Sequence, residues 1–238
     1  MPYQVAPRPE SPFYHERLAQ QYTAYDPAQA EAYLDRTGYL ARDEEGFRLA
    51  PDGKRLSLTI TVNYADMLAA LEQVQGHWRA VGVEMKIEML DRLEFNIRNE
   101  ANLLDGVAWL GEGGLDVMLT PQYYLPHSYD SHYAIAWVKW YQDAEDPQAE
   151  EPPEAVRRQM ALYDALRATA DPARQAVLMN QILQQAADAF YVIGICRQNR
   201  GFGIVKNTFK NVPAVMPASW TYPNPAPTNP SQYFIARE

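Results

Sequence analysis

Two carboxylates in a glycine-rich segment are the side chains best suited to chemistry in this sequence. Glu112 and Asp116 belong to GEGGLD, residues 111–116, which follows a predicted strand ending at Trp109. Because ligands of open α/β sheets bind beyond the carboxyl ends of the strands, both carboxylates are candidates to face a cleft. There they would bind a cationic group or, if the pKa of one were raised, act as the acid/base pair of a hydrolase. The alternative is a solvated acidic turn without a ligand.

Aromatic side chains are densest between residues 123 and 141. Four of them share a helical spacing that predicts a helix packed on the domain: Tyr133, Trp137, Trp140 and Tyr141. Tyr123 and Tyr124 lie off this stripe, in a loop bounded by Pro121 and Pro126. Amphipathic rings in such a loop can line a wet ligand cleft, and we keep that role open for both tyrosines.

The sequence contains no strong catalytic or metal-binding motif. It lacks a phosphate-binding glycine loop, a nucleophile elbow and an HExxH pair. His127 and His132 do not have the spacing of a helical ligand pair, and Cys196 is the only cysteine. The acidic stretch from residue 142 to 154 lacks the turn glycine of an EF-hand and is expected to be a solvated linker. We therefore expect no catalytic residue, no metal and no cofactor.

Composition and charge restrict the class of protein further. The chain has 238 residues and a net charge of −9, which fits a globular protein and disfavours binding to nucleic acid. No apolar stretch approaches the roughly 20 residues of a membrane span. The opening residues have neither the charged region nor the apolar region of a signal peptide, so we expect none within this chain.

The hydrophobic pattern predicts an α/β fold. Residues 56–62 and 83–89 alternate as strands do, and residues 68–81 between them have helical spacing, so the three form a βαβ unit with parallel strands. Asp-Pro and Asp caps, glycine stops and apolar stripes predict further elements: helices over 27–37, 91–99, 156–166 and 172–189, a hairpin at 45–53, and strands over 106–109 and 191–196. Both ends are rich in proline and large apolar residues, so we expect extended segments that lie on this domain or on another one.

The order of these segments resembles a known family. Residues 25–60 carry a helix beginning at Asp-Pro, then Gly-Tyr, a Gly-Phe turn and a Pro-Asp-Gly-Lys hairpin leading into a strand. This run, together with GVAWLGEGG at 106–114 and the closing helices, resembles solute-binding protein family 5, the oligopeptide- and dipeptide-binding receptors. The similarity covers about residues 13–210.

The resemblance implies one lobe of a periplasmic-binding-protein-like two-lobed clamp, with a mixed sheet flanked by helices. It implies residues 1–22 as a crossing segment from a missing N-terminal lobe, 23–198 as the ligand-binding lobe, and 199–238 as the return segment. The function it implies is the substrate-binding component of a bacterial ABC importer rather than an enzyme. The location would be periplasmic, or extracytoplasmic and membrane-associated, and the partners would be a peptide or other small polar solute and an inner-membrane permease.

The resemblance also assigns a role to the acidic turn. In peptide-binding relatives, an acidic residue shortly after the strand-end tryptophan pairs with the amino terminus of the ligand. Glu112 matches that position, although Gly113 and Gly114 stand where relatives often have bulkier residues. We therefore expect five residues to face the ligand cleft: Trp109, Glu112, Asp116, Tyr123 and Tyr124.

Overall fold

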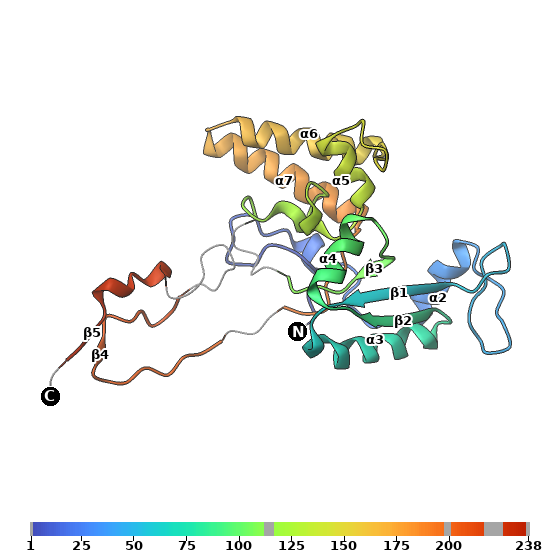
Figure 1. Ribbon diagram of the computed structural model, residues 1–238, viewed down its shortest axis with the longest axis horizontal. Coiled ribbons are helices and arrows are strands. Elements are labelled where there is room, and N and C mark those ends of the chain that lie inside the picture. The colour runs from blue at the N-terminus through green and yellow to red at the C-terminus, as the bar shows by residue number, and fades with distance from the viewer. Residues whose placement is uncertain (1, 112–116, 198–200, 217–225, 237–238) are drawn as a thin grey trace.

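The computed structural model describes residues 2–111, 117–197, 201–216 and 226–236. Helix α3 (Leu68–Ala80) lies on one side of a small sheet, and a group of helices lies on the opposite side (Figure 1). The C-terminal part of the chain extends away from both the sheet and the helices (Figure 1). Within the described residues, no helix is long and apolar enough to cross a membrane.

The sheet is built on the predicted βαβ unit. Strands β1 (Ser57–Val62) and β2 (Glu84–Met89) pair in parallel along their whole length, and α3 connects them. The short β3 (Gly106–Val107) pairs in parallel with the other edge of β1, which gives the order β2-β1-β3. The predicted α/β class is confirmed. In the part of the chain described, antiparallel strand pairing is limited to β4 (Phe209–Lys210) with β5 (Phe234–Ile235) and to isolated bridges.

The carboxyl end of β1 is covered on both faces. Val62 and Thr61 point to opposite faces, and both are buried. Val62 packs with Leu71 of α3 and Met85 of β2, whereas the hydroxyl of Thr61 donates to Glu88 at 3.3 Å. The alternating pattern predicted one buried face; on the other face Thr61 is buried at the end of the strand, whereas Ser57 and Thr59 are only partly buried.

The helix and the hairpin predicted before the first strand of the sheet are also confirmed. Asp26 caps α2 (Pro27–Arg36) by accepting a hydrogen bond from the backbone N–H of Gln29 at 2.9 Å. Antiparallel bridges between Arg42 and Arg48 and between Leu49 and Arg55 form the predicted hairpin region. Its turns use Gly46 and Gly53 at positive φ, which glycine adopts without steric cost.

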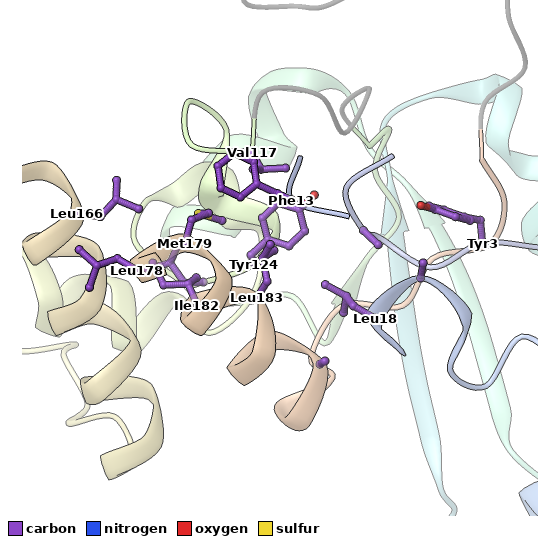
Figure 2. Packing of buried hydrophobic residues seen from close by; sticks show 14 residues of the cluster. Tyr3, Phe13, Leu18, Val117, Tyr124, Leu166, Leu178, Met179, Ile182 and Leu183 are labelled. Atoms are coloured by element: carbon purple, nitrogen blue, oxygen red, sulfur yellow. The ribbon is translucent and has the colours of Figure 1, made fainter. Parts of the chain in front are cut away.

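The helices form a second hydrophobic cluster (Figure 2). Helices α6 (Glu154–Ala168) and α7 (Pro172–Ala189) pack against each other, and Leu178 and Ile182 of α7 are fully buried. The buried amide of Gln159 donates to the carbonyls of Tyr124 and Ile182 at 2.9 and 3.0 Å. This amide therefore ties the loop around Tyr124 to both helices.

The N-terminal segment belongs to this helical cluster. Phe13 and Leu18 are buried against residues of α7 (Figure 2), and Tyr3 and Ala6 belong to the same cluster. The short α1 (Glu16–Gln20), which the sequence pattern did not predict, is capped by the ring of His15. The N-terminal segment thus lies on the body of this domain, one of the two placements expected for it.

The prediction of a buried strand over 191–196 is wrong. The segment is irregular, and Tyr191, Ile193 and Ile195 are exposed. Its only described ladder contact is an isolated bridge between Cys196 and Pro2. Because proline has no N–H to donate, it cannot propagate a ladder, so the β-like apolar run remains unpaired.

The aromatic helix forms, with a different buried face than predicted. Helix α5 (Ile135–Gln142) begins after Tyr133 and buries Ile135, Ala136 and Val138. Trp137 is half-buried and meets Tyr191 edge-on, with ring centroids 5.6 Å apart. Four further helical elements lie near the ends of the strands: helix α4 (Arg92–Glu100) and the 3-10 turns η1 (Ala65–Met67), η2 (Pro121–Tyr123) and η3 (Tyr129–Ser131).

The C-terminal segment leaves the body of the protein. Phe202 is 93% exposed and Ile204 92%, and the β4–β5 ribbon lies at the far end of the extension (Figure 1). Two further 3-10 turns, η4 (Ala226–Thr228) and η5 (Pro230–Gln232), precede β5. Most of the large apolar side chains in the described part of this C-terminal segment therefore belong to neither hydrophobic cluster.

Candidate functional site

Aromatic residues meet where two parallel strands end. Tyr64 follows the carboxyl end of β1 and Trp109 follows that of β3, and their ring centroids lie 5.3 Å apart. The backbone N–H of Ala108 donates to the carbonyl of Thr61 at 2.9 Å, which fixes the chain before Trp109 to β1. We call Tyr64, Arg92, Phe95, Trp109 and His132 the strand-end cluster.

Trp109 is held by rings from three parts of the chain. The buried Phe95 of α4 stacks on it with an interplanar angle of 27° and a centroid distance of 5.2 Å. The ring of His132 lies 4.2 Å from it, in a loop where His132 adopts the left-handed conformation. Asn99 of α4 donates to the carbonyl of Tyr129 at 3.0 Å and so anchors this loop. The indole is therefore preorganised rather than loosely placed.

Arg92 adds a positive charge to this cluster. Its guanidinium carbon lies 4.6 Å from the ring centroid of Trp109, within the range of a cation–π contact. Its Nη1 also donates a long hydrogen bond of 3.4 Å to the hydroxyl of Tyr64. Since Arg92 itself is exposed, the charge is available to solvent.

His132 is neutral near pH 7. Burial is the main cause that lowers the pKa of His132 to about 4; Asp130 opposes this shift, and nearby Arg92 contributes to it. Its Nδ1 is buried without a hydrogen-bond partner among the described residues, as is Oδ1 of Asn63 directly after β1. Unpaired buried polar atoms are uncommon in proteins. One of these two atoms belongs to the strand-end cluster, and the other follows β1, the central strand of the sheet.

The two histidines weighed as metal ligands do not form a pair. His127 packs against Tyr163 of α6 with centroids 5.0 Å apart, whereas His132 packs against Trp109. Burial lowers the pKa of His127 as well. Within the described ranges, no group of three potential metal-ligating side chains comes together.

The predicted site residues fall in different surroundings. Trp109 is the centre of the strand-end cluster, whereas Glu112 and Asp116 lie outside the described residues. The hydroxyl of Tyr123 donates to the carbonyl of Leu110 at 3.4 Å, so Tyr123 contacts the chain just after Trp109. Tyr124 is 4% exposed and belongs to the helical cluster. The five-residue cleft stays a prediction.

Sequence reasoning missed Tyr64, Arg92 and Phe95, and it considered His132 only as a metal ligand. Tyr64 and Arg92 each come two or three residues after a predicted parallel strand, at the edge where ligands bind in open α/β sheets. That position was the available signal for both. His132 lies far along the chain and reaches the cluster through the loop anchored by Asn99, which no local pattern reports.

The parallel sheet with flanking helices and an aromatic cluster beyond its carboxyl ends defines a fragment of a periplasmic-binding-protein-like fold. The sequence matches the family described as bacterial extracellular solute-binding proteins, family 5 Middle, over residues 2–150, which is more than half of the chain. The chain therefore belongs to the family 5 solute-binding proteins.

Solved structures agree with this membership. The oligopeptide-binding protein OppA is 27% identical with a TM-score of 0.79, and the match covers 99% of this chain and 39% of OppA. AppA from Bacillus subtilis, in complex with a nonapeptide, is 14% identical with a TM-score of 0.57, covering 97% of this chain and 41% of AppA. MelB from Agrobacterium fabrum C58, in complex with stachyose, is 19% identical with a TM-score of 0.65, covering 81% of this chain and 29% of MelB.

These coverages show that the chain spans well under half the length of the solved relatives it matches. A comparison with curated proteins gave no match. Since AppA and MelB are less than 25% identical to this chain, their similarity shows the fold alone.

Proposed function

We propose that this chain is the ligand-binding part of the substrate-binding component of an ABC importer, which captures a peptide-like solute and delivers it to an inner-membrane permease. The observation that carries the proposal is the strand-end cluster: a fixed indole and an exposed cation lie beyond the carboxyl ends of parallel strands in a member of family 5. Its activity is capture without a chemical step, and its place is outside the cytoplasm.

Coverage and exposure support the proposed division of the chain. Residues 23–198 form the ligand-binding lobe, and residues 1–22 and 199–238 are the segments that connect it with a first lobe. The exposed apolar residues of the C-terminal extension support a surface that another lobe covers. The match to only 39% of OppA supports the same division. Closure of two lobes by hinge motion would enclose the solute between them.

The proposed solute carries a cationic group. Trp109 supplies one wall, Glu112 binds the cation, and Asp116, Tyr123 and Tyr124 complete the cleft. A carboxylate that faces a cation in a partly desolvated cleft gives a strong and directional contact. OppA is named as an oligopeptide-binding protein and AppA was solved with a nonapeptide, which makes a peptide the first choice. MelB was solved with stachyose, so an oligosaccharide is the comparison ligand to test.

Calorimetric titration of the full chain with trialanine, N-acetyl-trialanine and stachyose tests this function. We expect trialanine to bind, N-acetyl-trialanine to bind more weakly, and Glu112→Ala to remove the difference between the two. Glu100→Ala, an exposed carboxylate at the end of α4, is the matched control and should change neither affinity. Chromatography of the mixture after a day should recover intact trialanine, whereas cleaved peptide would favour the hydrolase. Absence of binding to all three ligands would contradict a receptor role.

A further inference from the structure

Arg92 differs from the other arginine of its helix in how its charge is balanced. Arg98 is neutralised by two carboxylates, Glu94 at 2.7 Å and Glu88 at 3.0 Å. Arg92 makes no ion pair with any described carboxylate, and its recorded contacts are the ring of Trp109 and the hydroxyl of Tyr64. Helix α4 therefore carries one guanidinium paired with carboxylates, that of Arg98, and one without a described carboxylate partner, that of Arg92.

The contacts of Arg92 orient its remaining donors. The guanidinium carbon lies 4.6 Å from the ring centroid of Trp109, so the indole holds the charged end of the side chain on one side. The bond to Tyr64 uses one Nη1 donor of the five that an arginine carries. A planar fork fixed in this way matches the two oxygens of a carboxylate.

The position of Arg92 relates this fork to the sheet. Arg92 is the first residue of α4 and follows Asp91, the N-cap of this helix, shortly after β2. It contacts Tyr64, which follows β1, and Trp109, which follows β3. All three described strands of the parallel sheet thus end next to this one charge. A solute bound beyond their carboxyl ends would lie within reach of it.

We propose that Arg92 binds a carboxylate of the captured solute, with Trp109 and Tyr64 holding its guanidinium in place. The inference rests on the proposed receptor function and adds the chemistry of a second group on the solute. Together with the cation site proposed at Glu112, it selects a zwitterionic solute such as a peptide with free termini over a neutral sugar.

The test is a thermodynamic cycle between the ligand carboxylate and Arg92. Trialanine and trialanine amide are titrated calorimetrically into the wild-type chain, Arg92→Gln, Arg92→Lys and the control Arg98→Gln, with circular dichroism confirming that each variant is folded. We expect the wild type and Arg98→Gln to prefer the free acid by roughly tenfold, as a charge-assisted hydrogen bond gives. Arg92→Gln should bind both ligands alike, and Arg92→Lys should retain part of the preference.

An NMR titration of the Arg92 Nε–Hε resonance separates the possible anions. Acetate and trialanine should shift this resonance, and trialanine amide should not. A resonance that moves with inorganic phosphate but not with acetate would overturn the assignment to a carboxylate. An acid preference that survives in Arg92→Gln would overturn the role of Arg92 while leaving the receptor function intact. If neither peptide nor stachyose binds, both the inference and the receptor function fail.

Discussion

The guanidinium of Arg48 is almost fully buried and donates to the carboxylate of Asp35 at 2.5 Å. Asp35 belongs to α2 and Arg48 to the hairpin, and neither residue is a member of the two hydrophobic clusters. The same guanidinium donates to the carbonyls of Tyr39 and Val81, at 2.5 and 2.9 Å. Helix α2 itself has no buried residue, and its attachment therefore depends on these polar contacts.

Replacing Arg48 with alanine should destabilise the protein by about 2–4 kcal/mol, because two carbonyls lose a donor and a buried side chain leaves a void. Urea unfolding followed by circular dichroism measures this change. Lys54→Ala is the control, since the Lys54–Asp52 pair at 3.1 Å is solvent-exposed and should contribute less than about 1 kcal/mol. Equal effects of the two substitutions would contradict the anchoring role of Arg48.

Gln159 should be sensitive to a change of charge. Its amide donates to the carbonyls of Tyr124 and Ile182, and a glutamate carboxylate there would face two acceptors without a proton to offer. Gln159→Glu should therefore cost about 3 kcal/mol or more at pH 7, and part of the loss should be recovered at pH 4, where the new carboxyl takes up a proton. Gln181→Glu on the exposed face of α7 should stay near the wild type in the same unfolding series.

Gly194 should not accept a side chain. A Cβ at this position would lie 2.5 Å from the backbone carbon and Cα of Gln4, and the backbone N–H of Gly194 donates to the side chain of Gln4 at 2.6 Å. Gly194→Ala is expected to cost about 1–3 kcal/mol and to release the N-terminal segment to proteases. Gly201→Ala, where a Cβ would meet nothing within 4 Å, should leave both the melting temperature and the cleavage pattern unchanged.

The buried ring of His132 makes stability depend on pH. The folded-state pKa is about 4, below the ordinary value of 6.5, so the unfolded chain binds the extra proton between these values. Stability from this group is fully present above pH 6.5 and decreases as the pH falls toward 4. His132→Gln should flatten the dependence of unfolding free energy on pH in that window. His77→Gln, on the exposed face of α3, should retain the full slope, and a slope in His132→Gln equal to that of the wild type would contradict this origin.

The sequence was informative where a signal is local. Asp26 and Asp91 cap the helices they were predicted to cap, and the βαβ unit pairs in parallel as its period of two and helical spacing indicate. The spacing of Asp91 and Glu94 also fits a capping box, but only one half of it forms: the backbone N–H of Glu94 donates to Asp91, whereas the carboxylate of Glu94 binds Arg98. A charged partner one turn later competes for the same oxygen atoms.

The sequence was less informative where a contact joins distant segments. The apolar run after Tyr191 has strand character, but its partner is Pro2, and nothing near residue 191 reports that. The proline-bounded loop around Tyr124 was visible in the sequence, but the bond from Gln159 and the packing against α7 that fix this loop join it to segments far along the chain. Such outcomes depend on which surfaces meet in three dimensions, and local spacing does not determine them.

The burial of Phe13 and Leu18 against α7 has a consequence for synthesis. These residues are synthesised before α7, and the helix that covers them is completed more than 160 residues later, as the link from Arg17 to Asp188 across 171 positions illustrates. The βαβ unit, whose paired strands are separated by a single helix, is complete much sooner. We therefore expect the sheet to form before the helical cluster during translation. Until α7 is made, the apolar residues of the N-terminal segment stay exposed, and a chaperone would be suited to bind them.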